Sequence, residues 1–277
     1  MSGFLDHMAG ASRERVAAAR AREPAAALER RAAAAPPAPR FALDEAGFDL
    51  IAEIKRRSPA AGALVADGED SLARAQSYAR AGAAAVSVLT EPTRFDGALE
   101  HLEAIAAALR PLGVPAMRKD FLVDPYQVLE ARAAGAGGVL LILRMLSAAQ
   151  CAELLAAAQR HGLFVLLEAF DAPELARAGE IARAHAGRGT VLVGLNCRDL
   201  QTLAVVPGRF AELAPLLPAG APTVAESGVA TAEEARELRR LGYRLALVGS
   251  TLMTHPDPAD WIRAVLRSAR TGANQNG

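Results

Sequence analysis

One stretch of the sequence decides the fold, Leu50-Ile51-Ala52-Glu53-Ile54-Lys55-Arg56-Arg57-Ser58-Pro59. Side chains alternate across a β-strand, so Ile51, Glu53 and Lys55 share one face of a strand that begins here. An acid and a base among apolar neighbours are costly to bury unless they are paired or used in chemistry. Pro59 cannot donate a ladder hydrogen bond, so the strand ends before it. We therefore expect Glu53 and Lys55 to point into an active-site pocket.

The same pattern of a short apolar strand, a polar turn and an amphipathic helix repeats after residue 48. Apolar strands that alternate with helices indicate parallel pairing with both faces of the sheet covered. Eight such units in roughly 220 residues predict an α/β fold of the (β/α)8 TIM barrel type, whose typical length is about 250 residues. The alternative is an open doubly wound sheet, but its G-x-G-x-x-G motif does not follow the first strand. The predicted strands are 50–55, 84–90, 115–120, 138–143, 164–168, 191–196, 223–227 and 245–249, and the predicted helices are 71–81, 99–109, 126–134, 148–161, 173–185, 209–216, 232–241 and 258–269.

The residues before the first strand form a helical extension, which we place at 1–48 and expect to pack on the barrel. Ala, Arg and Glu dominate its first 35 residues or so. Pro24 divides this segment, because proline is tolerated near the N-terminus of a second helix. The proline-rich stretch 36–39 is expected to be a stiff linker. The barrel is predicted over 49–270, and the tail 271–277 is expected to be disordered.

Composition excludes several classes of function. Thirty-one basic residues balance thirty-one acidic ones, so we expect neither nucleic acid nor a membrane as a partner. Two cysteines and five scattered histidines form no disulfide framework and no metal-binding motif. Charged residues such as Asp6 and Arg13 precede any long apolar run, so we see no signal peptide. We expect a cytoplasmic protein that is a monomer, with a weak homodimer as the alternative.

Polar residues gather where the predicted strands end, which is where reactive groups of such barrels lie. Two lysines and three glutamates in a dry barrel mouth supply general acids and bases for chemistry at a carbonyl or an aromatic amine. A Schiff base on Lys55 or Lys119 is the alternative use of a lysine. The set contains no cysteine–histidine pair and no serine with a neighbouring base, so hydrolysis through a covalent nucleophile is not suggested. The residues at the strand ends are Glu53, Lys55, Lys119, Asp120, Glu168, Asn196, Arg198, Glu226, Ser227, Gly249 and Ser250.

Two further signals concern the ligand. The segments 226–229 and 248–251 follow the last two strands, where barrels commonly bind phosphate through loop and helix amides. Glycine permits close backbone approach there, and Ser58 adds a hydroxyl from the first strand. Phe95 and Phe121 lie at loop mouths, which suits an aromatic substrate. The alternative is that each phenylalanine only packs under its loop.

Six motifs in order give the chain a family resemblance: IAEIKRRSP at 51–59, SVLTEP at 87–92, RKDFLVDPYQ at 118–127, GLNCRDL at 194–200, AESGV at 225–229 and VGSTLM at 248–253. They resemble indole-3-glycerol phosphate synthase, and the resemblance runs from the N-terminal helices to about residue 266. That family is a (β/α)8 barrel with an extra N-terminal helical segment. The resemblance implies a step of tryptophan biosynthesis, in which 1-(2-carboxyphenylamino)-1-deoxyribulose 5-phosphate closes a ring and loses carbon dioxide and water. It implies no cofactor and no metal.

The resemblance also implies roles for individual residues. Lys119 matches the general acid, Glu168 matches the acid–base group of dehydration, and Lys55 matches the partner of the substrate carboxylate. How Lys55 and Lys119 divide the acid steps is left open. The implied catalytic set is Glu53, Lys55, Lys119, Glu168, Asn196, Glu226 and Ser227. The implied substrate-binding set is Ser58, Gly228, Gly249 and Ser250 near the phosphate, with Ser227 beside them, Phe95, Phe121, Leu140, Leu200 and Leu247 around the ring, and Arg198 at the rim.

Two other functions compete with this interpretation. Phosphoribosylanthranilate isomerase shares the fold and works through a Cys/Asp pair, and here the cysteine at a strand end is Cys197. The Glu53–Lys55 pattern argues against that enzyme. A barrel that only binds a phosphorylated ligand is the non-enzymatic alternative, and the presence of Lys119 and Glu168 argues against it.

Overall fold

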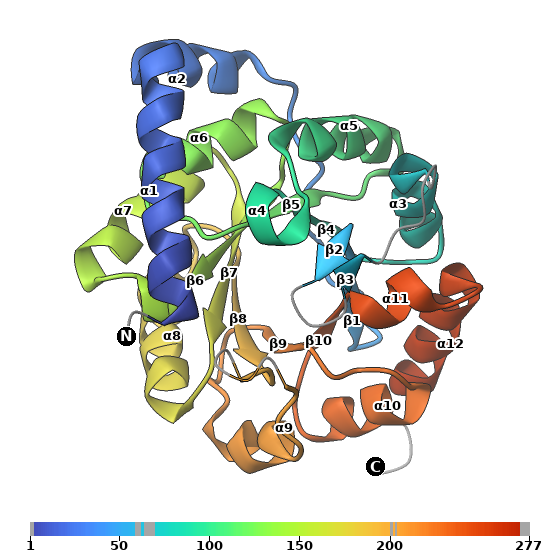
Figure 1. Ribbon diagram of the computed structural model, residues 1–277. Helices are drawn as coiled ribbons and strands as arrows, with labels where there is room; N and C mark the ends of the chain where they lie inside the picture. The colour runs from blue at the N-terminus through green and yellow to red at the C-terminus, as the bar shows by residue number, and fades with distance from the viewer. Residues whose placement is uncertain (1–2, 59–61, 64–69, 200–201, 203, 272–277) are drawn as a thin grey trace.

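The computed structural model describes residues 3–58, 62–63, 70–199, 202 and 204–271. Within these residues, eight parallel strands close into a barrel in the order β1-β10-β9-β8-β7-β6-β5-β4 (Figure 1). Since β1 pairs with both β4 and β10, the sheet has no open edge, and the predicted (β/α)8 barrel is confirmed over the doubly wound sheet. The strands are β1 (Asp49–Ile54), β4 (Ala85–Leu89), β5 (Ala116–Lys119), β6 (Gly138–Ile142), β7 (Phe164–Ala169), β8 (Val191–Asn196), β9 (Thr223–Glu226) and β10 (Leu245–Val248).

Helices cover the outside of the barrel, as Figure 1 shows. One predicted helix is shorter than expected, because Pro215 lacks the N–H that an α-helix needs. That helix ends at Leu213 and continues as a 3-10 turn. The barrel helices are α3 (Ser71–Arg80), α5 (Leu99–Leu109), α6 (Pro125–Ala133), α7 (Ala148–Arg160), α8 (Ala172–Ala184), α9 (Arg209–Leu213), α10 (Ala232–Arg240) and α12 (Pro258–Thr271). The short elements that the sequence pattern does not predict are β2 (Arg57–Ser58), β3 (Gly62–Ala63), α4 (Pro92–Phe95), α11 (Ser250–Thr254) and the 3-10 turns η1 (Arg110–Leu112), η2 (Leu143–Met145) and η3 (Ala214–Leu216).

The strands separate two apolar layers, as alternation requires. Leu50, Ala52 and Ile54 of β1 pack outward in the layer between the sheet and the helices. Ile51 of the same strand packs inward, in the layer that fills the barrel. Glu53 follows Ile51 on the inner face, so the strand carries its carboxylate to the end of the filled barrel interior. This is the arrangement expected from the alternating pattern of residues 50–55.

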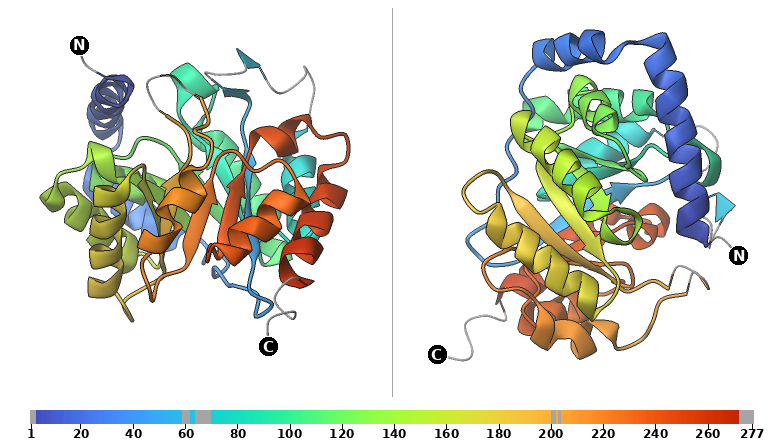
Figure 2. Two further views of the ribbon diagram at one scale, coloured as in Figure 1. Left: turned by 90° about the horizontal axis from the view of Figure 1, so that it is seen from below. Right: turned by 90° about the vertical axis from the view of Figure 1, so that its left-hand side faces the viewer.

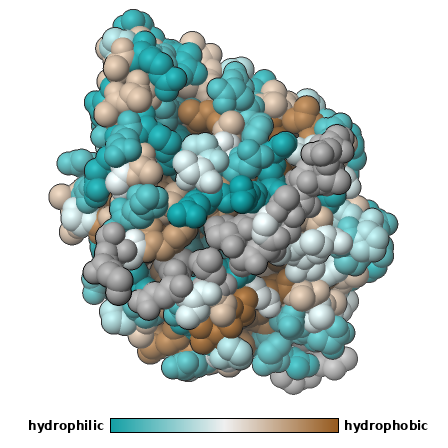
Figure 3. Space-filling view, viewed as in Figure 1, coloured by the Kyte–Doolittle hydropathy of each residue, from teal (hydrophilic) through white to brown (hydrophobic). Residues whose placement is uncertain are grey.

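Two helices precede the barrel. They are α1 (Phe4–Arg22) and α2 (Ala25–Ala34), and the break between them lies at Pro24 as predicted. A narrow stripe of α1 is buried, including Met8 and Val16, and its outward surface is largely hydrophilic (Figure 3). Figure 2 shows α1 at the same end of the barrel as α4 and the β2–β3 pair. The helix therefore lies beside the mouth formed by the carboxyl ends of the strands.

The end of the chain is attached to the opposite side of the barrel. Arg270 of α12 donates a hydrogen bond to the Phe48 carbonyl oxygen (2.9 Å) and pairs with Asp49 (2.9 Å). The last helix extends to Thr271, one residue into the predicted tail, and residues 272–277 lie outside the described part. The boundary between an extension at 1–48 and a barrel at 49–270 stays a prediction. Among the described helices, none has both the length and the apolar character needed to span a bilayer.

Candidate active site

A cavity of about 330 Å³ opens at the carboxyl ends of the strands. Of the predicted site residues, Ser58 and Leu200 are the two that we cannot place there. Ser58 lies in β2, but its side chain is outside the described part of the structure, and Leu200 is outside the described residues altogether. The predicted residues that line the cavity are Glu53, Lys55, Phe95, Lys119, Phe121, Leu140, Glu168, Asn196, Arg198, Glu226, Ser227, Gly228, Leu247, Gly249 and Ser250.

The first ion pair of the cavity joins Glu53 and Lys55, with Lys55 Nζ 2.9 Å from Glu53 Oε1. The Lys55 ammonium also donates to Ser250 Oγ (3.3 Å), which connects β1 with the turn after β10. Burial raises the pKa of Glu53, but the charges of Lys55 and Lys119 lower it more, so its pKa lies below the ordinary range. A methyl group on Gly249 would overlap Glu53 Oε1, so this glycine leaves room for the pair.

The second ion pair is looser. Lys119 Nζ lies 3.9 Å from Glu168 Oε2, and Asn196 donates to the other Glu168 oxygen (2.5 Å). The Asn196 side-chain oxygen accepts from the backbone N–H of Arg198 (2.9 Å), which fixes the orientation of the amide. Burial lowers the pKa of Lys119, but Glu168, Glu53 and Glu226 outweigh it and raise the pKa above its ordinary value. The neighbouring carboxyl groups therefore stabilise the charged form of the Lys119 amine.

Glu226 lacks the partners that Glu53 and Glu168 have. It is buried, and within the described residues neither of its oxygens has a hydrogen-bond partner. Burial and the neighbouring Glu168 raise its pKa well above the ordinary value, while Lys119 lowers it in part. The pKa values of Glu53 and Glu226 are thus shifted in opposite directions. The neighbouring lysines favour the charged form of Glu53, whereas burial and Glu168 favour the protonated form of Glu226.

One end of the cavity is a corner of backbone amides after β9 and β10. Ser227 (φ 70°) and Gly228 (φ 75°) are consecutive residues in the left-handed region, which is unusual for a serine. Gly249 and Ser250 begin the short helix α11 beside them. Thr251 Oγ1 donates to the Val229 carbonyl oxygen (2.9 Å) and holds the two turns together. Turns of this kind direct N–H groups into a cavity, which suits an anion such as phosphate.

The other end of the cavity is apolar and aromatic. The Phe121 ring lies 6.2 Å from the ring of Phe95 and 5.9 Å from that of Phe4. Sequence reasoning did not find Phe4 or Leu5, because nothing in their local spacing connects the first turn of α1 to a barrel strand. The lining residues that the sequence analysis did not connect with the site are Phe4, Leu5, Leu89, Ile142, Phe170, Val205 and Ala230.

Comparison with known proteins agrees with this geometry. The model of the family described as indole-3-glycerol phosphate synthase matches residues 5–265. The chain belongs to the indole-3-glycerol phosphate synthase family. The indole-3-glycerol phosphate synthase of a Nocardioides species is 44% identical over 227 residues, which cover 82% of each chain. The indole-3-glycerol phosphate synthase of Rhizorhabdus wittichii is 40% identical over 275 residues, which cover 97% of this chain and 100% of that one.

Solved structures share the fold at much lower identity. The 3-hexulose-6-phosphate synthase of Salmonella typhimurium has a TM-score of 0.60 at 14% identity and covers 81% of this chain and 99% of its own. A phosphoribosyl anthranilate isomerase has a TM-score of 0.54 at 16% identity, with the same coverage. At such identities the likeness shows the barrel fold alone. The assignment of the chain to the synthase family therefore rests on the family model and on the relatives with similar sequences.

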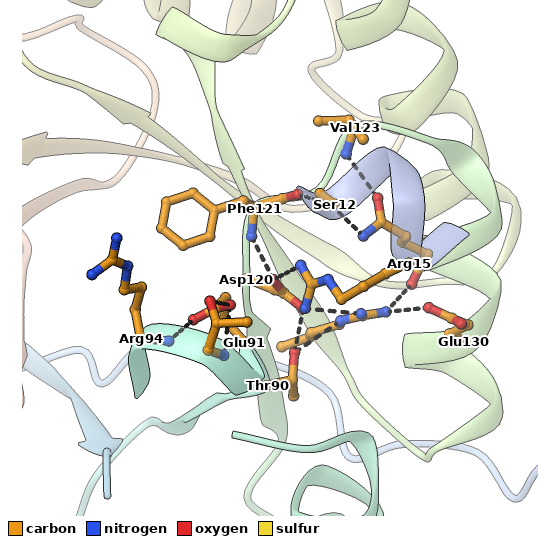
Figure 4. A network of polar contacts seen from close by, with 12 residues as sticks. Ser12, Arg15, Thr90, Glu91, Arg94, Asp120, Phe121, Val123 and Glu130 are labelled. Atoms are coloured by element: carbon orange, nitrogen blue, oxygen red, sulfur yellow. Dashed lines mark hydrogen bonds and ion pairs between the residues drawn. The ribbon is translucent and has the colours of Figure 1, made fainter. Parts of the chain in front are cut away.

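A buried network holds the residues beside Lys119 in this family member (Figure 4). The Asp120 carboxylate accepts hydrogen bonds from Arg15 (2.7 and 3.3 Å), Thr90 (2.8 Å), Arg118 (3.1 Å) and the backbone N–H of Phe121 (2.8 Å). Burial raises the pKa of Asp120, but Arg118 and Arg15 lower it more, so its pKa lies below the ordinary value. The network attaches α1 to the strand end that carries Lys119 and Phe121.

Replacing Arg15 with methionine is expected to lower the free energy of unfolding by roughly 1–3 kcal/mol, because Asp120 loses one charged partner and keeps Arg118. Since the folded pKa of Asp120 is depressed, its stabilising contribution is present above its unfolded pKa of about 3.9 and is lost as pH falls through the folded pKa. Without Arg15 the folded pKa rises, so acid unfolding should begin at a higher pH. Urea unfolding measured from pH 7 downward checks both effects.

The matched control for this prediction is Arg20→Met on the same helix. Arg20 pairs with Asp124 (2.7 Å), and both side chains are substantially exposed. An exposed pair contributes about 1 kcal/mol or less. Equal losses of stability in the two variants would mean that the Asp120 network adds nothing beyond ordinary attachment of α1.

Proposed function

We propose that this protein is an indole-3-glycerol phosphate synthase of tryptophan biosynthesis, which converts 1-(2-carboxyphenylamino)-1-deoxyribulose 5-phosphate to indole-3-glycerol phosphate. The observation that carries the proposal is one cavity in which two lysines and three glutamates lie between an amide corner and an aromatic wall. The family membership of the chain supports the same reaction. The substrate has a phosphate at one end and an aromatic ring at the other, with a ketone sugar between them.

The two ends of the cavity would hold the two ends of this substrate. The phosphate would bind at the turns of Ser227-Gly228 and Gly249-Ser250, where backbone N–H groups and a serine hydroxyl are within reach. The ring would lie against Phe121 and Phe95. Binding at both ends orients the sugar carbonyl toward the lysines, and such positioning lowers the barrier of a ring closure substantially.

Ring closure joins an aromatic carbon to the ribulose carbonyl carbon, and the carbonyl oxygen must gain a proton. Lys119 would supply this proton, since the carboxyl groups around it keep its amine charged in the free protein. The charge also stabilises negative charge that develops on the oxygen before the proton arrives. A charged amine is a poor nucleophile, so the Schiff-base alternative is not favoured for Lys119.

Loss of carbon dioxide needs the substrate carboxylate to be held while electrons move into the ring system. Lys55 would pair with that carboxylate and share acid duty with Lys119. The Lys55 ammonium is oriented by its ion pair with Glu53, in which Lys55 Nζ lies 2.9 Å from Glu53 Oε1. Ring closure leaves a positive charge on the aniline nitrogen and interrupts the aromatic ring. The electrons of the broken carbon–carboxylate bond neutralise that charge and restore the aromatic ring as carbon dioxide leaves.

Dehydration completes the reaction. An acid protonates the hydroxyl, which leaves as water. A base then removes a proton from the new ring, and the loss of this proton completes the indole. Glu168 would be the acid–base group, since Asn196 fixes one of its oxygens and Lys119 lies on the other side. Glu53, Asn196 and Glu226 would orient the lysines and the sugar hydroxyls, with Arg198 at the rim.

The isomerase alternative is not supported by the one cysteine near the site. The Cys197 thiol contacts the Val206 carbonyl oxygen at 2.8 Å, and burial raises its pKa above the ordinary value. A buried thiol of this kind is a weak base and a weak nucleophile. The non-enzymatic alternative leaves the buried charges of Glu168 and Lys119 without a use.

A direct assay tests the proposed function. The full chain is mixed with the carboxyphenylamino-ribulose phosphate in buffer that contains EDTA, and indole absorbance is followed. We expect indole-3-glycerol phosphate to form without added metal or nucleotide. Formation of no indole product, or activity that requires a metal, would contradict the proposal. The monomeric state and the cytoplasmic location stay predictions, which gel filtration and cell fractionation can check.

A further inference from the structure

The carboxyl group of Glu226 lies over a glycine of the neighbouring strand. The register pairs Glu226 with Asn196, and Gly194 precedes Asn196 by two residues on the same inner face of β8. A methyl group on Gly194 would overlap Glu226 Oε1. The same methyl group would lie 3.1 Å from the Glu226 carboxyl carbon and 3.1 Å from Leu166 Cδ1. The space that a side chain would fill at position 194 is occupied by the end of Glu226.

The backbone gives no other reason for a glycine here. Gly194 lies inside β8 and pairs in register with Glu168 on one side and Val224 on the other. Its φ is not among the positive values that favour glycine. A glycine inside a strand weakens the strand and often marks a close approach of another group. The close approach here is that of the Glu226 carboxyl group.

We propose that Gly194 is a positioning residue, whose missing side chain gives the Glu226 carboxyl group a buried seat between β7 and β9, below the substrate. This inference rests on the proposed function for its effect on turnover. The position of the Glu226 carboxyl group over Gly194 follows from the coordinates and does not depend on that function. In this position Glu226 has both Glu168 and Lys119 as charged neighbours, and among the described residues it makes a hydrogen bond to neither.

The charges around this seat favour the protonated form of Glu226. Burial raises the pKa of Glu226 most, Glu168 on β7 and Glu53 on β1 raise it further, and Lys119 on β5 lowers it in part. A protonated Glu226 can donate a hydrogen bond to a sugar hydroxyl or to Glu168. A protonated Glu226 also does not compete for Lys119, which can then pair with Glu168 and with the substrate oxygen.

Gly194→Ala is the decisive variant. The overlapped atom ends a rotatable side chain, so the barrel can accept the methyl group by turning Glu226 into the cavity, where it approaches Lys119 and ionises. We expect the variant to fold, to lower kcat by about 10-fold or more with little change in KM, and to lose one protonated carboxyl signal in the infrared spectrum at pH 7. Glu226→Gln identifies that signal in the otherwise unchanged protein. Retention of both the signal and the wild-type kcat would overturn the proposal.

A matched control is Gly138→Ala on β6. A methyl group there would overlap the Phe164 ring and no carboxyl group. This variant is expected to lose stability but to keep the infrared signal and the kcat of the folded fraction. Loss of the signal in Gly138→Ala as well would make the effect of Gly194→Ala a general loss of packing and would overturn the proposal.

Shortening Glu226 provides a test that does not depend on the folding of one variant. In a Glu226→Asp background the carboxyl group is one methylene shorter and clears a methyl group at position 194. Gly194→Ala should therefore cost less, in stability and in kcat, in the Asp background than in the wild type. An equal cost in both backgrounds, or failure of Gly194→Ala to fold in both, would show that Leu166 and not Glu226 requires the glycine. Because the infrared and stability measurements need no turnover, a protein without synthase activity would refute the proposed function and leave this inference decidable.

Discussion

Replacing Lys119 with methionine is expected to lower kcat by about 100-fold or more, the usual scale for loss of a general acid. In the proposed reaction Lys119 would give a proton to the ribulose carbonyl oxygen, and its ammonium nitrogen lies 3.9 Å from Glu168 Oε2. Methionine has a similar length and suits an apolar environment, so the barrel should remain folded. Binding of inorganic phosphate should change little, because the amide corner belongs to β9 and β10.

The control for this variant is Arg144→Met, which removes a cation at the end of β6. Arg144 pairs with Asp171 and Glu174 and does not line the cavity. Its loss should leave kcat unchanged within about twofold. Steady-state kinetics and phosphate titration of the wild type, Lys119→Met and Arg144→Met test the acid role of Lys119. Near-normal turnover in Lys119→Met would reject the acid role.

Glu168→Gln is expected to lower kcat by roughly 100-fold while KM moves little, since we propose that the carboxylate acts in dehydration and not in holding the ligand. The amide of glutamine keeps the size of the side chain but cannot take up or deliver a proton. A decarboxylated product that still retains the hydroxyl should accumulate in single-turnover samples, where mass spectrometry can detect it.

The control for the second variant is Glu180→Gln, an exposed glutamate on α8. It should behave as the wild type in every measurement. A rise in KM with unchanged kcat in Glu168→Gln would place Glu168 in substrate binding and would contradict the assignment.

The sequence predicted the barrel and most of the cavity for a simple reason. Alternation along parallel strands fixes which residues face inward, and closure of the barrel brings the carboxyl ends of all strands to one mouth. Lys55 and Lys119 are 64 positions apart in the sequence, yet both follow from this rule. The same rule places Glu168 and Glu226 at the same mouth.

Other features depend on tertiary contacts that no local pattern contains. Arg15 reaches Asp120 across 105 residues, and Phe4 enters the aromatic wall from the first turn of α1. The short elements α4 and α11 offer too few residues for a helical period to be visible. Glu226 could be placed at a strand end from sequence, but its raised pKa depends on burial and on the neighbouring Glu168 and Glu53, which only the fold brings together.

The central claim is that Lys55, Lys119 and Glu168 act on a single ligand held by its phosphate and by its ring. A crystal structure with a reduced, unreactive form of the substrate tests it most directly. We predict the phosphate at the amides of Gly228 and Gly249, the ring against Phe121, and Lys119 Nζ within hydrogen-bond distance of the oxygen on the reduced carbonyl carbon. A ligand bound with its ring at the β9–β10 turns, or with Lys119 and Glu168 away from the sugar, would contradict the account.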